Sequence, residues 1–265
     1  MKMIKLIATD MDGTFLRDDM TYDEAKFDKL YQKLQSQQIQ FVVASGNQYF
    51  QLKSFFKKYP DIIYISENGA LIRQRDNTLS KHSFTKETVQ TVLEKLQAIS
   101  NLKLLVCGEK SAYTLTTTDP KHVKKMRNYY HHLDVIENFD QIDDDVLKFA
   151  ITCPDEQTDE IVETLKTALK GLAEPTSSGH GDIDVIQLGM NKAAGLKELG
   201  KILDIDLSEM MAFGDGGNDL EMLREVGWGV AMENAQPKVT AVADQTTADN
   251  QNQGVLQKIE EFLAN

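Results

Sequence analysis

The chain has 265 residues, a length that suits one elaborate domain or two linked domains. Hydrophobic residues make up 41% of it and charged residues 26%, fractions typical of globular proteins that exclude a disordered or fibrous chain. The formal net charge of -12 argues against nucleic acid and anionic lipid as partners, because both bind clustered Lys and Arg. An anionic ligand would need local positive charge from a metal ion, a lysine or helix N-termini.

Cysteine content and hydropathy indicate a reducing, aqueous compartment. Cys107 and Cys153 lie far apart without metal-ligand spacing, which favours two buried thiols over a disulfide. No apolar run approaches the ~18 residues needed to span a bilayer, and no signal-peptide pattern precedes the first predicted strand. We therefore expect a cytoplasmic protein that has no membrane partner.

The N-terminal part alternates buried strands with amphipathic helices. Short apolar runs bounded by polar turns predict strands covered on both faces, at 4–9, 39–44 and 62–65. Helical spacing of apolar residues predicts a helix around 27–34, opened by a capping box of Thr21 and Glu24, and a second helix around 49–56. This order predicts a parallel sheet of the α/β class.

After residue 83 the pattern changes to that of an α+β module. Helices are expected around 89–96, after Asp119 and Pro120, and around 161–169; strands are expected at 104–106, 112–116, 147–153 and 183–186. We therefore expect residues 84–187 to form a separate module with an antiparallel sheet.

One expected strand of this module, 147–153, has a clear period of two. Its apolar residues alternate with Lys148, Ala150 and Thr152. This alternation predicts that one face of the strand meets water.

The α/β pattern resumes after the module. Helices are expected around 196–203, 220–223 and 259–262, and a strand at 210–213. The polar stretch 244–253 is predicted to be a surface loop. The module is therefore inserted into a first unit made of residues 1–83 and 188–265.

Residues 10–14 (DMDGT) directly follow the first strand, at the edge where open α/β sheets bind ligands. Two carboxylates at this spacing can divide the work. Asp10 would be ionised as nucleophile and metal ligand, while Asp12 exchanges protons with the leaving oxygen. Gly13 permits the tight turn by which the chain leaves the strand. An acidic turn would also explain the two aspartates, but the complete string favours chemistry.

Residues 214–219 (GDGGND) follow the strand 210–213 and precede a helix. Such a loop presents oxygen ligands at the same edge of the sheet. Mg²⁺ prefers one or two carboxylates with waters and phosphate oxygens, so Asp215 together with Asp10 suits it, whereas zinc would favour His or Cys. Taken alone, such a segment is more often a turn than a site, and it becomes informative only together with DMDGT.

Two further segments could hold a phosphate. Ser45 and Gly46 end the second strand and open a helix, where a hydroxyl and free backbone N–H groups bind anions; the alternative is an N-cap serine. Lys192 lies at the start of a helix just after the module, where a cation is mildly unfavourable. That position favours a functional role over the alternative of a solvated surface lysine.

In this order, the four segments resemble the motifs of the haloacid dehalogenase superfamily, specifically its Cof-type (subfamily IIB) hydrolases with a large inserted cap. The resemblance covers essentially the whole chain. Three more segments resemble the sugar phosphatases of that group: 44–48 (ASGNQ), 67–70 (ENGA) and Lys148 with Phe149. The resemblance implies a Rossmann-like parallel-sheet core with a C2B-type α+β cap.

The resemblance also implies a function: a Mg²⁺-dependent phosphatase for small metabolites, most of all hexose or pentose phosphates. Asp10 would form an aspartyl-phosphate, and Asp12 would act as general acid and base. The Mg²⁺ ligands would be Asp10, the Asp12 carbonyl and Asp215, with Asp219 in support. The residues that would hold the substrate are Ser45, Gly46, Asn47, Lys192 and Asn218.

One departure from the family pattern concerns specificity. Many Cof-type members have Thr-Gly-Arg where this chain has Ser45, Gly46 and Asn47, so an amide replaces a cation. Because an amide both donates and accepts hydrogen bonds, Asn47 would suit a polyhydroxylated substrate.

Two alternatives remain: a phosphomutase with the same nucleophile, and, from another class, a phosphorylatable receiver or a sensor. A sugar phosphomutase would pass the phosphoryl group to another sugar hydroxyl, and a phospho-ligand sensor would bind without turnover. Asp12 argues against a stable aspartyl-phosphate switch, which has no use for a general acid. The expected partners are small sugar phosphates, and the chain is expected to be a monomer or weak homo-oligomer. Residues 179–182 are candidate substrate contacts, although a flexible turn also explains them.

Overall fold

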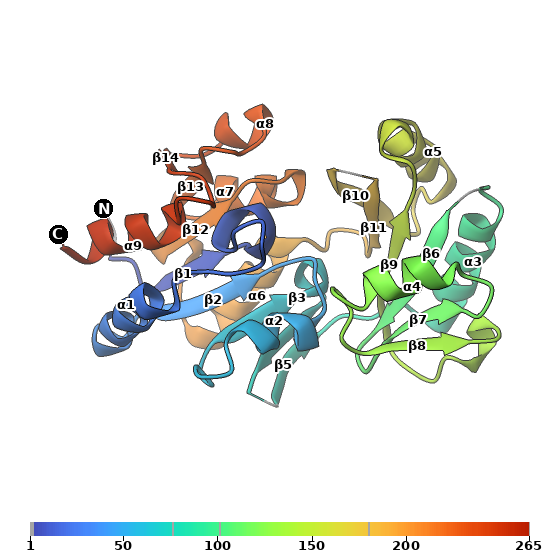
Figure 1. Cartoon of the computed structure of the whole chain (residues 1–265), viewed down its shortest axis with the longest axis horizontal. Helices are drawn as coiled ribbons and strands as arrows, with labels where there is room; N and C mark the ends of the chain where they lie inside the picture. The colour runs from blue at the N-terminus through green and yellow to red at the C-terminus, as the bar shows by residue number, and fades with distance from the viewer. Residues whose placement is uncertain (1–2, 76, 101, 180, 265) are drawn as a thin grey trace.

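The computed structural model describes residues 3–75, 77–100, 102–179 and 181–264, whose strands form two sheets in two adjacent lobes (Figure 1). The core sheet has, in spatial order, β14 (Gln245–Thr247), β13 (Trp228–Met232), β12 (Met210–Gly214), β1 (Leu6–Thr9), β2 (Gln40–Ala44), β3 (Ile63–Ser66), β4 (Leu71–Gln74) and β5 (Asn77–Lys81). The cap sheet has, in spatial order, β10 (Glu174–Gly179), β11 (Asp182–Ile186), β9 (Val146–Thr152), β6 (Lys103–Gly108), β7 (Ala112–Leu115) and β8 (Leu133–Ile136).

The core sheet is parallel from β14 to β3 and antiparallel only at the β3–β4–β5 hairpins. Its helices are α1 (Glu24–Ser36), α2 (Tyr49–Phe55), α6 (Lys192–Leu203), α7 (Leu220–Glu225), α8 (Pro237–Thr240) and α9 (Gly254–Ala264). In β1, Ile7 packs with α1, α2 and α9, while Leu6 and Ala8 pack with α6, α7 and α8. Both faces are therefore buried, which explains the continuous apolar runs of the parallel strands.

The cap sheet is antiparallel except for the parallel pair of β7 and β8. Its helices are α3 (Lys86–Gln97), α4 (Pro120–Met126) and α5 (Thr158–Ala168). Helices α3 and α5 pack in one apolar cluster with β9 and β11, and α4 packs in a second cluster with β6. Cys107 and Cys153 are buried free thiols, as predicted. The strands β8 and β10 were not predicted.

The chain enters the cap after β5 and returns after β11, so the cap sheet lies between two parts of the core in the sequence. The boundaries at residues 83 and 188 stay a prediction. None of the helices formed by the described residues is long and apolar enough to cross a membrane. The cytoplasmic location and the oligomeric state likewise stay predictions.

The predicted capping box of α1 is wrong. The helix begins at Glu24, and the side chain of Asp23, not Thr21, caps it by accepting a hydrogen bond from Lys26 N at 2.9 Å. Thr21 is held in the preceding loop, because its backbone N–H and its hydroxyl both donate to Asp19 Oδ1.

The prediction that one face of β9 meets water is also wrong. Lys148 is only 2% exposed, and Ala150 and Thr152 are partly buried. All three line a cavity of about 380 Å³ that also reaches Asp12 of the core. The polar face of the cap sheet therefore covers the core rather than facing bulk solvent, a packing that the period of two by itself does not reveal.

The stretch 244–253 is more than the surface loop that was predicted. It contains β14, and Asn250 and Gln253 are buried. Asn250 Nδ2 donates to Leu16 O at 2.9 Å, and Gln253 Nε2 donates to Phe15 O at 3.2 Å. These amides satisfy carbonyls at the end of η1 (Met11–Phe15), the segment that leaves the sheet after Asp10.

We predict that Asn250→Ala lowers the free energy of unfolding by about 1–3 kcal/mol, because it leaves the carbonyl of Leu16 without its donor. Urea unfolding followed by circular dichroism measures the change. The matched control is Asn252→Ala, since Asn252 is exposed and its amide binds only Asp249, so its effect stays within about 0.5 kcal/mol. Equal losses in the two variants would contradict this account of the segment.

Candidate functional site

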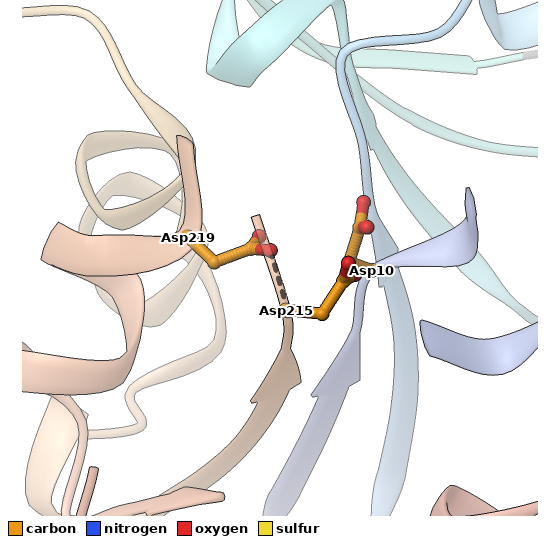
Figure 2. Close-up of side chains that lie close together, drawn as sticks. All are labelled: Asp10, Asp215 and Asp219. Carbon is orange, nitrogen blue, oxygen red and sulfur yellow. Dashed lines mark hydrogen bonds between the residues drawn. The ribbon is translucent and has the colours of Figure 1, made fainter. Parts of the chain in front are cut away.

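Three carboxylates meet at the carboxyl ends of two neighbouring strands. Asp10 directly follows β1, and Asp215 directly follows β12, the strand beside it. Asp219 ends η6 (Gly217–Asp219), and its side chain reaches back toward the other two (Figure 2). One carboxylate oxygen from each residue lies within 4.8 Å of the others. The parallel register of β1 and β12 thus brings together residues that are about 200 positions apart in the sequence.

The residues after Asp10 also position Asp215. Thr14 Oγ1 donates to Asp215 Oδ1 at 2.6 Å, across 201 residues of sequence. Gly13 has a φ of +74°, and a Cβ atom at this position would lie 2.6 Å from Asp215 Oδ2. A larger residue would therefore be strained and would displace the carboxylate, which is the physical reason for glycine in DMDGT.

Lys192 connects two of the three carboxylates. Its side chain has no exposed surface, and Nζ donates to Asp10 Oδ1 and to Asp219 Oδ1, each at 2.6 Å. Asp219 Oδ2 accepts from the backbone N–H groups of Asp215 and Gly216, each at 3.0 Å. The alternative of a solvated surface lysine is therefore excluded. The two carboxylate oxygens of Asp219 therefore bind Lys192 and the loop that follows β12.

The cluster carries more negative than positive charge. Burial raises the pKa of Asp10 well above its ordinary value, against the opposing effect of Lys192. Burial, with a contribution from the Asp219 carboxylate, also raises the pKa of Asp215 to about 6. Although burial disfavours the ammonium of Lys192, Asp10 and Asp219 hold its pKa above the ordinary value. Carboxylate oxygens are ligands of the kind that Mg²⁺ prefers. A bound Mg²⁺ would also supply positive charge that Lys192 by itself does not provide.

Asp12 lies apart from this cluster. Its Oδ2 accepts a hydrogen bond of 2.6 Å from Asn47 Nδ2, and both residues line the cavity of about 380 Å³. Burial raises the pKa of Asp12, while the bond from Asn47 opposes that rise. A carboxyl group with a raised pKa at the cavity wall can donate a proton to a bound ligand. The structure thus gives Asn47 a contact with Asp12 that the sequence did not predict.

Ser45 and Gly46 form a turn between β2 and α2. Ser45 is 2% exposed, and its Oγ accepts a hydrogen bond of 3.1 Å from Asn47 N. The alternative of an N-cap serine is wrong, because α2 begins at Tyr49 and is preceded by Gln48. Asn218 lines the cavity beside Asp12 and donates to Asn68 Oδ1 at 3.3 Å.

Of the candidates at 179–182, Asp182 lines the cavity and accepts from Thr152 Oγ1 at 3.1 Å. The carbonyl of Gly181 accepts from Cys153 N within the cap, and His180 lies outside the described residues.

The cap also contributes cavity residues that were missed as site residues: Lys125, Tyr129, Tyr130 and Asp184. The helical spacing of Tyr130 predicts a buried side chain, and the side chain is buried. This spacing cannot tell whether a buried residue lines a cavity or packs in the core. For Lys148, which also lines the cavity, the resemblance to sugar phosphatases was the sole signal.

Comparisons with known proteins agree with this geometry. The model of haloacid dehalogenase-like hydrolases matches residues 7–259. The chain belongs to this family. A relative from Escherichia coli (strain K12), named 5-amino-6-(5-phospho-D-ribitylamino)uracil phosphatase YbjI, is 41% identical over 261 residues, which cover 98% of this chain and 96% of the relative.

Two solved structures share the whole haloacid dehalogenase fold of this chain. SMU.1108c from Streptococcus mutans UA159 has a TM-score of 0.93 and 31% identity, with 99% of this chain and 100% of that chain covered. The subclass IIB sugar phosphatase BT4131 has a TM-score of 0.81 and 23% identity, with 97% and 98% covered, so that likeness concerns the fold alone. These findings confirm the predicted family and the α/β core with its inserted cap.

Close to the site, Glu67 is a buried acid with a perturbed pKa. It follows β3 in η2 (Glu67–Gly69), is 1% exposed, and its Oε2 lies 3.4 Å from Lys148 Nζ. Burial raises its pKa from 4.5 to about 7, because the ionised form loses its hydration. The folded chain therefore binds this proton more tightly than the unfolded chain does.

The sign of the pH effect follows from that difference in proton affinity. As the pH rises from about 4.5 to about 7, the folded state retains a proton that the unfolded state has lost, so stability falls across this window. We predict that Glu67→Gln, which stays neutral, removes this component, on the order of 3 kcal/mol over the window. Urea unfolding at several pH values measures it, with the exposed Glu163→Gln as control. Parallel pH curves for wild type and Glu67→Gln would contradict the assignment.

Proposed function

We propose that this chain is a Mg²⁺-dependent phosphatase that hydrolyses phosphate monoesters of small metabolites, in particular sugar phosphates, through an aspartyl-phosphate on Asp10. The proposal rests above all on one observation: the buried Lys192 joins Asp10 and Asp219 beside Asp215, at the carboxyl ends of β1 and β12. This arrangement supports the proposal, because a nucleophile, a cation and carboxylate oxygens would then surround one position for phosphate and metal ion.

The residues divide into two binding roles. Asp10, Asp215 and the carbonyl of Asp12 would hold Mg²⁺, while Asp219 holds Lys192 and the loop after β12 in place. When bound, the ion offsets the repulsion between the carboxylates and an incoming phosphate. The phosphoryl group would be held by Lys192, by Ser45 and Gly46 of the turn, and by Asn218.

The reaction has two steps. In the first, a carboxylate oxygen of Asp10 forms a bond to phosphorus, the bond to the substrate oxygen breaks, and Asp12 gives that oxygen its proton. In the second, Asp12 takes a proton from water as the water oxygen bonds to phosphorus, and phosphate leaves with the carboxylate of Asp10 restored. Asn47 orients Asp12 for both transfers through its hydrogen bond of 2.6 Å.

The cavity supports a polyhydroxylated leaving group. The carboxylate of Asp182 can accept hydrogen bonds from hydroxyls, and the rings of Tyr129 and Tyr130 offer a flat apolar surface. The relative from Escherichia coli is named for a substrate that joins a ribityl phosphate to a uracil ring. That compound therefore belongs in the test panel beside hexose and pentose phosphates.

We predict that the wild type releases phosphate from members of this panel with Mg²⁺, and that EDTA abolishes the release. Asp10→Asn lowers the rate by several orders of magnitude, because an amide cannot attack phosphorus. The control is Asp159→Asn, on the exposed side of α5, which keeps the wild-type rate. A well-folded wild type that releases no phosphate from any member would overturn the proposal in favour of a mutase or a sensor.

We predict that Asp12→Asn separates the two steps. p-Nitrophenolate leaves without a proton, so p-nitrophenyl phosphate still phosphorylates Asp10, whereas hydrolysis of the acyl phosphate needs the base. Rapid-mixing absorbance should show a burst of p-nitrophenolate close to one equivalent per chain, followed by turnover about 10²–10⁴-fold slower than wild type. Equal slowing of both phases, without a burst, would remove Asp12 from the second step.

A further inference from the structure

Two segments that the proposed reaction does not use meet at the boundary between cap and core. Lys148 lies on β9 of the cap sheet, and its Nζ donates to Gly46 O at 2.7 Å and to both carboxylate oxygens of Asp184 at 2.9 Å. Gly46 belongs to the core, whereas Asp184 lies on β11 of the cap. The lysine therefore connects a partly buried ion pair of the cap to a backbone carbonyl of the core.

Asn68, from the segment 67–70, completes the junction. Its Nδ2 donates to Asp184 Oδ2 at 2.6 Å, and its Oδ1 accepts from Asn218 Nδ2 at 3.3 Å. Its backbone N–H donates to Ser45 O at 3.1 Å. One asparagine thus contacts the cap carboxylate and two of the core segments expected to hold the phosphoryl group.

The junction is complete only when cap and core are together. Lys148 is 2% exposed, and Asp184 holds its pKa above the ordinary value although burial opposes the charged form. An ammonium without water needs a full set of hydrogen-bond partners. If the cap moved away, Asp184 would move with Lys148, but the carbonyl of Gly46 and the amide of Asn68 would lose their partners.

The carbonyl of Gly46 is linked directly to the turn. It shares one planar peptide unit with the N–H of Asn47, so fixing the oxygen also fixes the direction of that N–H. The N–H donates to Ser45 Oγ at 3.1 Å, and the side chain of the same asparagine donates to Asp12. A displacement of the peptide would therefore disturb the hydroxyl that faces the phosphate and the contact that orients the acid.

We propose that Lys148 is a positioning residue that couples closure of the cap to the geometry of the turn at 45–47. This inference rests on the proposed phosphatase function, because the turn is assigned there to the phosphoryl group. The lysine acts through the carbonyl of Gly46 rather than on the substrate. Its effect is therefore the same for every phosphate monoester, whatever the leaving group.

Independence from the leaving group is tested by measuring kcat/KM of the Lys148→Met variant with several phosphate monoesters. We expect kcat/KM to fall about 10- to 100-fold, by similar factors for p-nitrophenyl phosphate and for a hexose phosphate, because small misplacement of a positioned group carries a cost of that size. The inhibition constant of inorganic phosphate should rise as well. The matched control, Lys124→Met on the exposed side of α4, keeps wild-type values. A loss confined to the hexose phosphate would make Lys148 a substrate contact and overturn the proposal, as would unchanged kinetics.

A second variant and a second measurement separate this role from folding and from the phosphatase assignment. Asp184→Asn keeps the shape of the side chain but removes the charge that pairs with Lys148, and it should reproduce the uniform kinetic loss. Amide hydrogen exchange followed by NMR reports on the N–H groups of Asn47 and Asn68. We expect faster exchange at both amides in both variants, measured against amides of α1 as an internal reference. Unchanged exchange would overturn the coupling even if the wild type hydrolysed no substrate.

Discussion

The ammonium of Lys192 between Asp10 and Asp219 is the interaction on which the arrangement of the site depends. It joins three parts of the chain, β1, the start of α6 and the loop after β12, and the lysine side chain has no exposed surface. Three carboxylates around one cation remain short of positive charge, and burial makes that shortage costly. A divalent cation could supply this missing positive charge, as the proposed function requires.

In the proposed reaction, groups of the core sheet would act on phosphate and groups of the cap sheet would contact the rest of the substrate. The parallel strands β1 and β12 end at the same edge of the sheet, so the loops that follow them lie close together. The polar face of β9 then closes the cavity from the opposite side.

The stretch 244–253 shows how polar residues can be structural. Polar composition alone indicates a loop, yet Asn250 and Gln253 are buried. Their side-chain amides donate to the carbonyls of Leu16 and Phe15, which need donors where the chain leaves the sheet. Lys148 is a second example. Its charge predicts exposure to solvent, but the side chain is buried and its partners lie in both the cap and the core. In both cases the side chain is held inside by hydrogen-bond partners that no pattern in the sequence identifies.

The sequence by itself determined the α/β class, the insertion of an α+β segment, and the four ordered segments that carry Asp10, Ser45, Lys192 and Asp215. These follow from local periodicity and from short strings of residues, which depend on near neighbours in the chain. Only the folded structure shows that Asn47 binds Asp12 and that Lys148 is buried against Gly46. Such contacts join residues by their positions in space after sheets and helices pack, and spacing along the chain does not encode those positions.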